Sequence, residues 1–569
     1  MPGFTIVLNN TNRLLNLEID TPSFFDKFKK EVNNFENVFF HSLTNNKFHD
    51  DKLFDADDDY FIGIDGFILN LRQLKSKYSV SDNFTLIRKI YKEDKKRFVN
   101  ILKGDFCGFI YEKNTNKLTV FTNQTGTKRI FYYFKNNILI ISSDFKFIVQ
   151  ILRNNSFDYC LDELGAYCLL SYGYMIKDIT LINEIKKLEP GCLLISENTT
   201  MEIHRYYDYN NIEYSSDSKE KIISTIDELF SNAVELEYEK DLEYNYNHIA
   251  TLSGGLDSRM NVMIAHQLGY KNQLNITFSQ SMYYDYIIAN KIANDLYHDF
   301  LFMSLDNGNS QLNLDQNFFL NDGLIFYSGA AHALFMSKAI NWDDYGLLHT
   351  GMIGDANLGS FIKNTNKSDK PNPYDGADNK RIIPKINNDI DYLISSYKNN
   401  EIYLFYNRAF NGANNGYLIF ELFTYAVSPF LEKEFLEYCI SIPPEFKVNQ
   451  TIYLEWIDKK HPEVAEYIWE KMRTKPKLGA WYKYYSLFKR AWDVFVTKNR
   501  TMNPRDKWYR DNLNLKNFID SYMNDKINLL DKYPELYKDA LILKNEGNFS
   551  EKTQLITLLK AFETYFYRF

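Results

Sequence analysis

A six-residue glycine loop constrains the fold of this chain more than any other feature. Ser253-Gly-Gly-Leu-Asp-Ser258 follows an apolar segment with strand character, residues 247–252, and opens a segment with helical periodicity, residues 257–270. Glycines at such a junction let backbone N–H groups approach phosphate oxygens, and the start of a helix adds partial positive charge. The loop therefore predicts a phosphate site at a strand end in an α/β domain.

The loop differs from two common nucleotide-binding motifs. It carries no lysine where a Walker loop has one, and the chain contains no GxGxxG sequence. Asp257 would repel a bound phosphate unless a cation lay between them, so we assign Asp257 to magnesium. An ordinary turn, with Asp257 capping the helix, is the structural alternative.

Sequence patterns divide the chain into three predicted parts. Residues 1–210 contain short apolar segments separated by turn residues, which predicts a layered antiparallel-sheet domain with a few helices. Residues 211–480 alternate single strands with longer helical segments, which predicts a parallel sheet covered by helices. Residues 481–569 mix aromatic and charged residues, which predicts a helical tail. The expected fold class is α/β.

Composition excludes several classes of protein. The 569 residues carry a formal net charge of -8 at pH 7, so no broad basic surface is expected to bind nucleic acid or an anionic membrane. The five cysteines show neither metal-ligand spacing nor the even number of a disulfide framework. The N-terminus lacks a secretion signal, and no apolar run approaches the roughly 20 residues that span a bilayer. We therefore expect a cytoplasmic protein.

Segments outside the loop narrow its interpretation. The loop resembles the pyrophosphate loop of the ATP pyrophosphatases, which cleave ATP to AMP and pyrophosphate. Residues 348–359, LHTGMIGDANLG, resemble the GEGxDExxGG motif of the asparagine synthetase superfamily, and residues 428–431, SPFL, resemble its PFLD segment. Four N-terminal segments also resemble segments of this superfamily. Residues 66–70 resemble its GEIYN, residues 104–108 its GxFA, residues 142–146 its SSExK and residues 185–191 its I-xx-L-x-PG segment. The resemblance implies an Ntn-glutaminase-like domain followed by an ATP-pyrophosphatase synthetase domain.

This resemblance implies a set of site residues. Asp355 of the second motif would join Asp257 in holding magnesium ions, and the loop would bind the pyrophosphate part of ATP. The residues implied in ATP binding are Leu252, Ser253, Gly254, Gly255, Leu256, Asp257, Ser258 and Gly351. Phe278 and Ser279 follow a predicted strand where the family contacts adenine, although strand-end core packing explains them equally well.

Two catalytic assignments stay open. The family's charge-stabilising lysine corresponds to Lys475 by its R-x-K pattern or to Lys477 by its K-L-G pattern. Glu421 precedes the SPFL segment much as the amine-deprotonating glutamate does in β-lactam synthetase, and a helix-surface glutamate is an equal alternative. The five histidines between residues 248 and 349 lack paired metal-ligand spacing, so we interpret them as ordinary residues.

The chain departs from the family at its N-terminal nucleophile. Glutamine-dependent members carry a cysteine where this chain has Pro2, and the first hundred residues contain no cysteine. We therefore expect no glutaminase activity and a structural N-terminal domain, as in the related β-lactam synthetase and lasso-peptide cyclases. Met352 and Ala356 replace two residues that are glutamates in asparagine synthetases, which argues against asparagine as the product.

The expected function is ATP-dependent synthesis of an amide bond. A carboxylate, from a small molecule or a peptide, would be adenylated with release of pyrophosphate, and ammonia or an amine would then displace AMP. The alternatives are an intramolecular cyclase of the lasso-peptide or β-lactam type, a subunit whose N-terminal domain docks a partner protein, and a non-catalytic binding homologue. The sequence leaves the carboxylate, the amine and a homodimeric state open.

Overall fold

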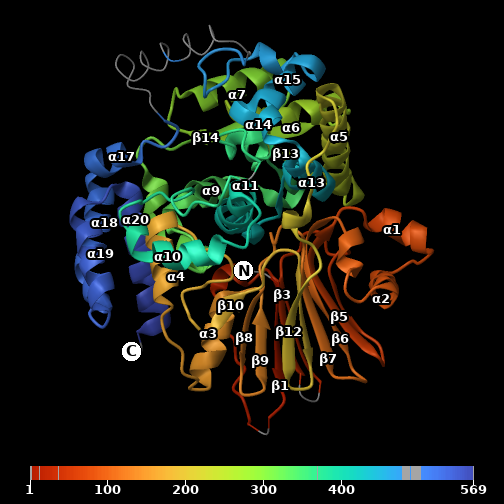
Figure 1. Cartoon of the computed structure of the whole chain (residues 1–569), viewed down its shortest axis with the longest axis vertical. Coiled ribbons are helices and arrows are strands. Elements are labelled where there is room, and N and C mark those ends of the chain that lie inside the picture. Colours follow the sequence, from red (N-terminus) through yellow and green to blue (C-terminus); the bar gives the residue numbers. More distant parts are fainter. Residues whose placement is uncertain are drawn as a thin grey trace.

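Two six-stranded antiparallel sheets lie in the N-terminal part of the computed structural model (Figure 1). The structure describes residues 3–11, 13–35, 38–367, 369–476, 487 and 501–567. The first sheet has the order β10-β8-β9-β1-β3-β2, with β1 (Gly3–Asn9), β2 (Lys29–Phe35), β3 (Val38–Thr44), β8 (Phe131–Lys135), β9 (Ile138–Ser142) and β10 (Ile185–Lys187). The second has the order β12-β11-β7-β6-β5-β4, with β4 (Leu53–Ala56), β5 (Tyr60–Ile68), β6 (Gly104–Glu112), β7 (Lys117–Thr122), β11 (Cys192–Glu197) and β12 (Thr200–Arg205).

The two sheets pack face to face through alternating side chains. Phe4, Ile6 and Leu8 on one face of β1 belong to the same buried cluster as Phe109 of β6. The rings of Phe4 and Phe109 meet edge to face, with centroids 5.1 Å apart. Because side chains alternate along a strand, every second residue of β1 points into this core.

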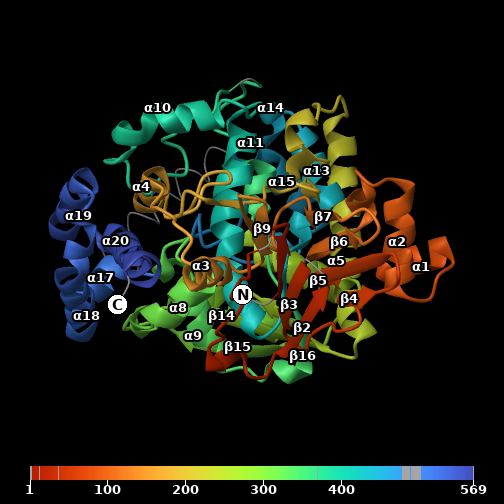
Figure 2. The same ribbon diagram turned by 90° about the horizontal axis from the view of Figure 1, so that it is seen from below.

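Helices cover the outer faces of both sheets (Figure 2). The helices α1 (Leu71–Tyr78) and α2 (Asn83–Glu93) pack on the second sheet, and α3 (Phe145–Asn154) and α4 (Glu163–Tyr172) pack on the first. Asp162 caps α4 by accepting a hydrogen bond from the Gly165 N–H over 3.0 Å. The order helix, sheet, sheet, helix is the layered antiparallel architecture that the sequence predicts.

A five-stranded parallel sheet forms the centre of the next part. Its order is β15-β14-β13-β16-β17, and every neighbouring pair is parallel. The strands are β13 (Asn247–Thr251), β14 (Gln273–Ser279), β15 (Asp299–Ser304), β16 (Tyr345–His349) and β17 (Ala426–Val427). The predicted strand and helix around the glycine loop are β13 and α6 (Leu256–Gln267). Because β13 and β16 are parallel neighbours, the loops that follow them leave the same edge of the sheet.

Helices cover both faces of this parallel sheet. Ala250 of β13 faces a buried cluster shared with α5 (Lys219–Glu243), α6 and α7 (Tyr284–Asp295), whereas Ile249 faces a cluster with α9 (Ala331–Ser337). The other helices of this part are α8 (Leu314–Asn321), α10 (Ile383–Ile394), α11 (Asn400–Leu404), the π-helix η8 (Phe405–Ala413), α12 (Asn414–Tyr417), α13 (Lys433–Ser441), α14 (Pro444–Lys447) and α15 (Thr451–Lys460).

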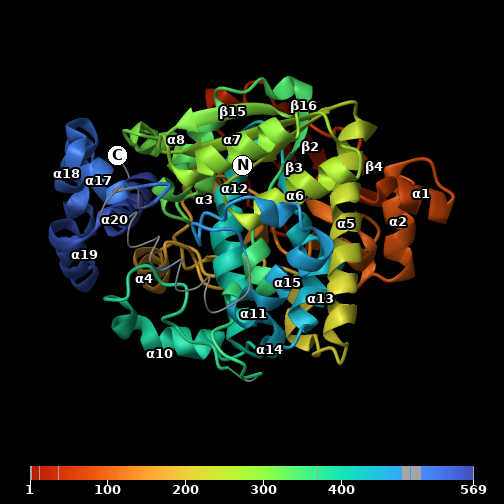
Figure 3. The ribbon, with the colours of Figure 1, turned by 90° about the horizontal axis from the view of Figure 1, so that it is seen from above.

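The C-terminal helices pack against both preceding parts (Figure 3). They are α17 (Arg505–Asp511), α18 (Leu513–Lys526), α19 (Pro534–Glu546) and α20 (Phe549–Ala561). Tyr167 of α4 donates its hydroxyl to Asp539 Oδ2 over 3.1 Å, and the Tyr327 N–H donates to Thr557 Oγ1 over 3.0 Å. The predicted tail is therefore helical, and it contacts the N-terminal part as well as the parallel-sheet part.

The α/β fold class is confirmed, with antiparallel sheets first, a parallel sheet next and helices at the C-terminus. The predicted boundary between residues 210 and 211 falls between β12 and α5. The division into three domains stays a prediction. None of the helices in the described part of the chain combines the length and the apolar character that crossing a bilayer requires.

Candidate functional site

Hydroxyl groups hold the glycine loop in shape. Ser253 Oγ lies 2.9 Å from Ser258 Oγ, and the Ser253 N–H donates to Ser258 Oγ over 3.0 Å. The Gly254 N–H donates to Asp285 Oδ1 over 2.8 Å. Gly255 precedes α6, and no side chain caps the start of this helix. The uncapped N–H groups of the first turn are therefore the part of the loop best suited to bind a phosphate.

Two glycines let the second motif, residues 348–359, approach the loop closely. A Cβ atom on Gly351 would lie 2.2 Å from the backbone nitrogen of Ser258, and one on Gly354 would lie 2.6 Å from Cγ of Asp257. Larger residues at these positions would push the two segments apart. The backbone N–H of Asp355 donates to Asp257 Oδ2 over 3.0 Å. The structure thus brings together the two aspartates that we assigned to magnesium.

The environment of Asp257 disfavours its negative charge when no cation is present. Burial, and then the charge of Asp355, raise the pKa of Asp257 to about 8. Tyr453 opposes this rise by donating its hydroxyl to Asp257 Oδ1 over 2.9 Å. A divalent cation bound to both carboxylates would remove the penalty, and such oxygen donors suit magnesium. The residues present therefore fit the predicted metal.

The loop and the second motif line a cavity of about 320 Å³, which we call the loop cavity. Seven of the predicted ATP-binding residues line it: Leu252, Ser253, Gly255, Asp257, Ser258, Phe278 and Gly351. Its other walls are Thr251, Ile276, Thr277, His332, Met352, Tyr417 and Met502. The volume falls within the range of small-molecule sites.

Three predicted ATP-binding residues do not line the loop cavity. Leu256 is buried in the cluster between α5 and α6. Ser279 is fully buried, and its hydroxyl donates to the Gln280 carbonyl over 2.9 Å. Gly254 lies against Glu470, whose Cβ would be 2.8 Å from a Cβ at position 254. In this structure these residues support the walls of the cavity instead of facing it.

Glu421 lies in a buried ion cluster. Lys128 Nζ lies 2.8 Å from Glu421 Oε2 and 2.6 Å from Asp65 Oδ2. Glu421 belongs to the 3-10 helix η9 (Leu418–Leu422) and is 5% exposed. It is therefore not the helix-surface glutamate considered from the sequence, and it does not line the loop cavity either. The ion pair instead joins the N-terminal part to the parallel-sheet part.

The two candidate catalytic lysines differ in their setting. Lys475 is half exposed and forms an ion pair with Glu466, and it does not line the loop cavity. Lys477 lies outside the described residues, so its role stays a prediction. Lys471 is a basic residue that no motif indicated, and its charge acts to lower the pKa of Asp257.

Other site residues also carry no signal in the sequence. Tyr453 lies in α15, His332 in α9 and Tyr417 at the end of α12. None of them belongs to a motif that we recognised. They reach the site only because their helices pack around the same edge of the parallel sheet.

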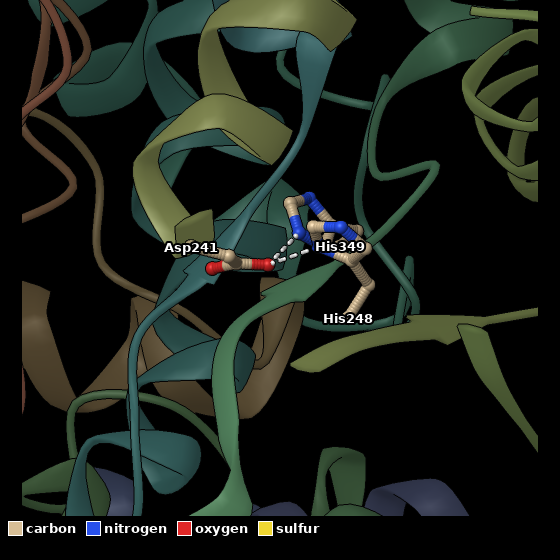
Figure 4. Close-up of side chains that lie close together, drawn as sticks. All are labelled: Asp241, His248 and His349. Atoms are coloured by element: carbon tan, nitrogen blue, oxygen red, sulfur yellow. Dashed lines mark hydrogen bonds and ion pairs between the residues drawn. The ribbon is translucent and has the colours of Figure 1, made fainter. Parts of the chain in front are cut away.

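A buried hydrogen-bonded triad lies at the start of the second motif (Figure 4). Oδ2 of Asp241 accepts hydrogen bonds from His248 Nδ1 at 2.9 Å and from His349 Nε2 at 2.8 Å. Oδ1 of Asp241 accepts from the Leu347 N–H at 2.7 Å. No sequence pattern indicated this contact, because α5, β13 and β16 meet only in the folded sheet; the interpretation of these histidines as ordinary residues stays a prediction.

The triad carries charge in the protein interior. Burial would lower the pKa of His349, but the charge of Asp241, the hydrogen bond to Asp241 and the Glu237 carboxylate 3.6 Å from His349 Nδ1 raise it to about 9. The three donor atoms lie within 4.8 Å of one another, and no other such group of His, Cys, Asp and Glu occurs among the described residues. Because Asp241 already bonds both rings, we interpret the group as a support for β16 and not as a metal centre.

Comparisons with known proteins show similarity to glutamine amidotransferases and to an asparagine synthetase. Residues 46–207 match the glutamine amidotransferase domain family. A protein assigned as glutamine-hydrolyzing asparagine synthetase 2 in Methanocaldococcus jannaschii is 27% identical over 238 residues, which cover 41% of this chain and 44% of that protein. Amidase chry2 of Gibberella zeae is 22% identical over 186 residues, which cover 32% of this chain and 26% of that protein. The chain thus spans less than half the length of either curated relative.

Two solved structures show weak similarity. The allosteric regulatory enzyme of purine biosynthesis matches with a TM-score of 0.22 and 11% identity, over 47% of this chain and 66% of that one. Glutamine phosphoribosylpyrophosphate amidotransferase from B. subtilis matches with a TM-score of 0.23 and 11% identity, over 48% and 77%. These scores are too low to inform the fold. This chain is therefore similar to glutamine amidotransferases over residues 46–207 and to an asparagine synthetase over 238 residues.

Proposed function

We propose that this chain is an ATP-dependent synthetase that joins a carboxylate to ammonia or an amine through an acyl-adenylate. The contact between Asp257 and Asp355 carries the proposal, because it gathers two carboxylates beside a loop suited to phosphate. The relation to an asparagine synthetase agrees with amide formation.

In this proposal ATP occupies the loop cavity. Its phosphates lie toward the uncapped start of α6, and its base lies toward Phe278 at the end of β14. Asp257 and Asp355 hold Mg²⁺, which supplies positive charge to the phosphate oxygens. Tyr453 keeps the Asp257 carboxylate oriented through its hydroxyl group.

The proposed chemistry has two steps. A carboxylate oxygen of the substrate attacks the α-phosphorus of ATP, and pyrophosphate leaves. The nitrogen of ammonia or an amine then attacks the acyl carbon, loses a proton and displaces AMP. Lys475 or Lys477 stabilises the negative charge that develops on the acyl oxygen. Glu421 has no part in these steps, because its carboxylate is paired with Lys128.

The proposed enzyme does not hydrolyse glutamine itself. Pro2 occupies the position of the cysteine nucleophile. The four cysteines of the N-terminal half all have a raised pKa, chiefly because burial disfavours the thiolate: Cys107, Cys160, Cys168 and Cys192. None of these thiols is therefore a good substitute nucleophile.

Exchange of radiolabelled pyrophosphate into ATP, measured with Mg²⁺ and a panel of carboxylic acids, tests adenylation. We expect exchange with at least one acid and a loss of about a hundredfold or more in Asp257→Asn and Asp355→Asn. Asp295→Asn is the matched control, because Asp295 is an exposed residue of α7 that pairs with Lys291. Exchange that persists in both site variants, or that no acid supports, would contradict the proposal.

A further inference from the structure

We propose that a second cavity beside the loop cavity binds the carboxylate substrate, and that Arg408 and Arg505 select a substrate with an additional anionic group. This inference rests on the proposed function, because it assigns the place of the acid that becomes adenylated. The anionic group is a carboxylate or a phosphate. An apolar spacer separates it from the reacting carboxylate.

The two cavities adjoin. The second has a volume of about 360 Å³, which is sufficient for a small organic acid. Thr251, Phe278, His332 and Tyr417 line both cavities. A substrate in the second cavity can therefore present one end at this shared wall beside Thr251, which directly precedes Leu252 and Ser253 of the loop cavity.

The charges that line the second cavity do not balance. Arg408 comes from the π-helix η8, and Arg505 begins α17. Asp378 is the only acidic residue among the described residues that line this cavity. Burial raises its pKa, and the charges of Arg408 and Arg505 both act to lower it. His332 is neutral, because burial and then the charge of Arg505 lower its pKa to about 3. The lining therefore carries one uncompensated positive charge.

Neither guanidinium group has a fixed partner. Among the described residues, Arg408 and Arg505 form no ion pair or side-chain hydrogen bond, and their observed contacts are with the rings of Phe361 and Phe326 at 6.0 and 5.8 Å. Burial lowers the pKa of Arg505, which shows that its charge is poorly solvated. An incoming anion would replace the missing solvation of Arg505, whereas Arg408 is exposed to solvent; each guanidinium group can bind an anion through two N–H donors.

Aromatic rings also line the second cavity. Tyr172 and Tyr174 use their hydroxyls to donate to the carbonyls of Pro373 and Gly376, over 2.7 and 3.2 Å, so these hydroxyls already have partners. Small residues complete the lining and leave space within it: Gly329, Ala330, Ala333, Gly412, Ala413 and Gly416. This lining suits a flat or apolar spacer more than a polar one.

His332 marks the junction of the two cavities. Its ring lies tilted against that of Phe278, with centroids 4.5 Å apart, and its buried Nδ1 has no hydrogen-bond partner among the described residues. The two cavities therefore meet at an uncharged aromatic surface formed by His332 and Phe278.

Three compounds that share a benzoate ring and differ in the group opposite the carboxylate test the inference: terephthalate, its monomethyl ester and 4-phosphonobenzoate. Calorimetric titration without ATP measures their binding to the full chain. We expect terephthalate or the phosphonate to bind at least about tenfold more tightly than the ester, because only these carry a second anion. The tighter of the two dianions identifies carboxylate or phosphate as the preferred group.

Two single-residue variants test whether the arginines cause the preference for a dianion over the ester. Arg408→Gln and Arg505→Gln should each reduce the affinity for the preferred dianion about tenfold or more, while ester binding and Mg·ATP binding stay within about twofold. Arg510→Gln is the matched control, because Arg510 lies in the same helix α17 but is 72% exposed and paired with Asp511. The comparison of dianion with ester in the unmodified protein stands even if a variant folds poorly.

The results separate this inference from the proposed function. Equal binding of ester and dianions, binding of no probe, or identical behaviour of Arg505→Gln and Arg510→Gln would overturn the anion site. Selective binding of a dianion without any pyrophosphate exchange would support the anion site and contradict adenylation. Exchange supported equally by the ester and the diacid would support adenylation and overturn the anion site.

Discussion

The backbone N–H of Asp355 donates a hydrogen bond to Oδ2 of Asp257 across 3.0 Å and links two motifs that lie far apart in the sequence. The link forms because β13 and β16 are parallel neighbours and because positions 351 and 354 are glycine. The backbone of the second motif is therefore fixed beside the Asp257 carboxylate. Such preorganisation reduces the conformational entropy that is lost when a metal binds.

Replacement of Gly351 by alanine should separate the two motifs. Its Cβ would lie 2.2 Å from the backbone nitrogen of Ser258, and the backbone there cannot yield without moving the loop. We expect a loss of about 1 to 3 kcal/mol in unfolding free energy and a loss of Mg·ATP binding by calorimetry. Gly416→Ala is the stability control, because the nearest atom to its Cβ would be 3.6 Å away. Normal nucleotide binding by Gly351→Ala would contradict this account.

Removal of the Tyr453 hydroxyl should weaken magnesium binding. That hydroxyl donates to Asp257 and holds the pKa of Asp257 below the value that burial and Asp355 would otherwise give. Because Mg²⁺ binds the ionised carboxylate, Mg·ATP affinity should fall as the pH decreases through about 8. In Tyr453→Phe this fall should begin at a higher pH, and affinity at pH 7.5 should be about 3- to 10-fold lower.

Calorimetric titration of Mg·ATP at several pH values measures this shift. Tyr270→Phe serves as the control, because its hydroxyl donates to Glu239 on an exposed surface. A pH dependence that is the same in Tyr453→Phe and Tyr270→Phe would count against the role of Tyr453.

His349 should make stability depend on pH in the neutral to alkaline range. Its pKa is about 9 in the folded protein against an ordinary 6.5, so the folded state binds the proton more tightly. The stability from this group is fully present below pH 6.5 and is lost as the pH rises through 9. The stability advantage of the unmodified protein over His349→Gln should therefore shrink by up to about 3 kcal/mol across this window.

Urea unfolding at a series of pH values provides this comparison. The difference between the two proteins isolates His349 from other groups that titrate in the same range, Asp257 among them. His49→Gln is the control, because the side chain of His49 is 70% exposed. A difference between unmodified protein and His349→Gln that does not vary with pH would refute the assignment.

Glu421→Gln should affect stability more than catalysis. The change weakens the buried contact with Lys128, which keeps its partner Asp65, so we expect a cost of about 1 to 3 kcal/mol. Pyrophosphate exchange and amide formation should fall together and by no more than about threefold. If exchange were normal and amide formation alone collapsed, Glu421 would be the base that the sequence suggested.

The glycine motifs could be predicted because their requirement is local. A strand end, a tight loop and a helix start lie within 24 residues, 247–270, and the close approach at Gly351 and Gly354 admits no side chain. Phe278, which we predicted from its place near the end of a strand, lies in β14 next to β13 and lines the loop cavity, and its contact with the base stays a prediction. These residues lie where the order of strands and helices in a parallel sheet puts them. That order can be predicted from one sequence, because strands and helices alternate along it.

Glu421, His349 and Tyr453 show why the rest could not be predicted. The setting of Glu421 depends on Lys128, which comes from the other half of the chain. His349 acquires its charge from Asp241 on α5, and Tyr453 reaches Asp257 from α15. Periodicity places a residue on one face of its own element, but it does not name the element that packs against that face. Lys477 cannot be judged, because it lies outside the described residues.

The turn that follows α4 has a consequence for the whole N-terminal half. Tyr172, Gly173 and Tyr174 line the cavity proposed for the acid, although they belong to the half without a nucleophilic cysteine. Excision of residues 1–210 would leave that cavity open to bulk water on one side. The N-terminal part thus forms one wall of the proposed acid site, and a chain that lacks residues 1–210 should be unable to discriminate among acids.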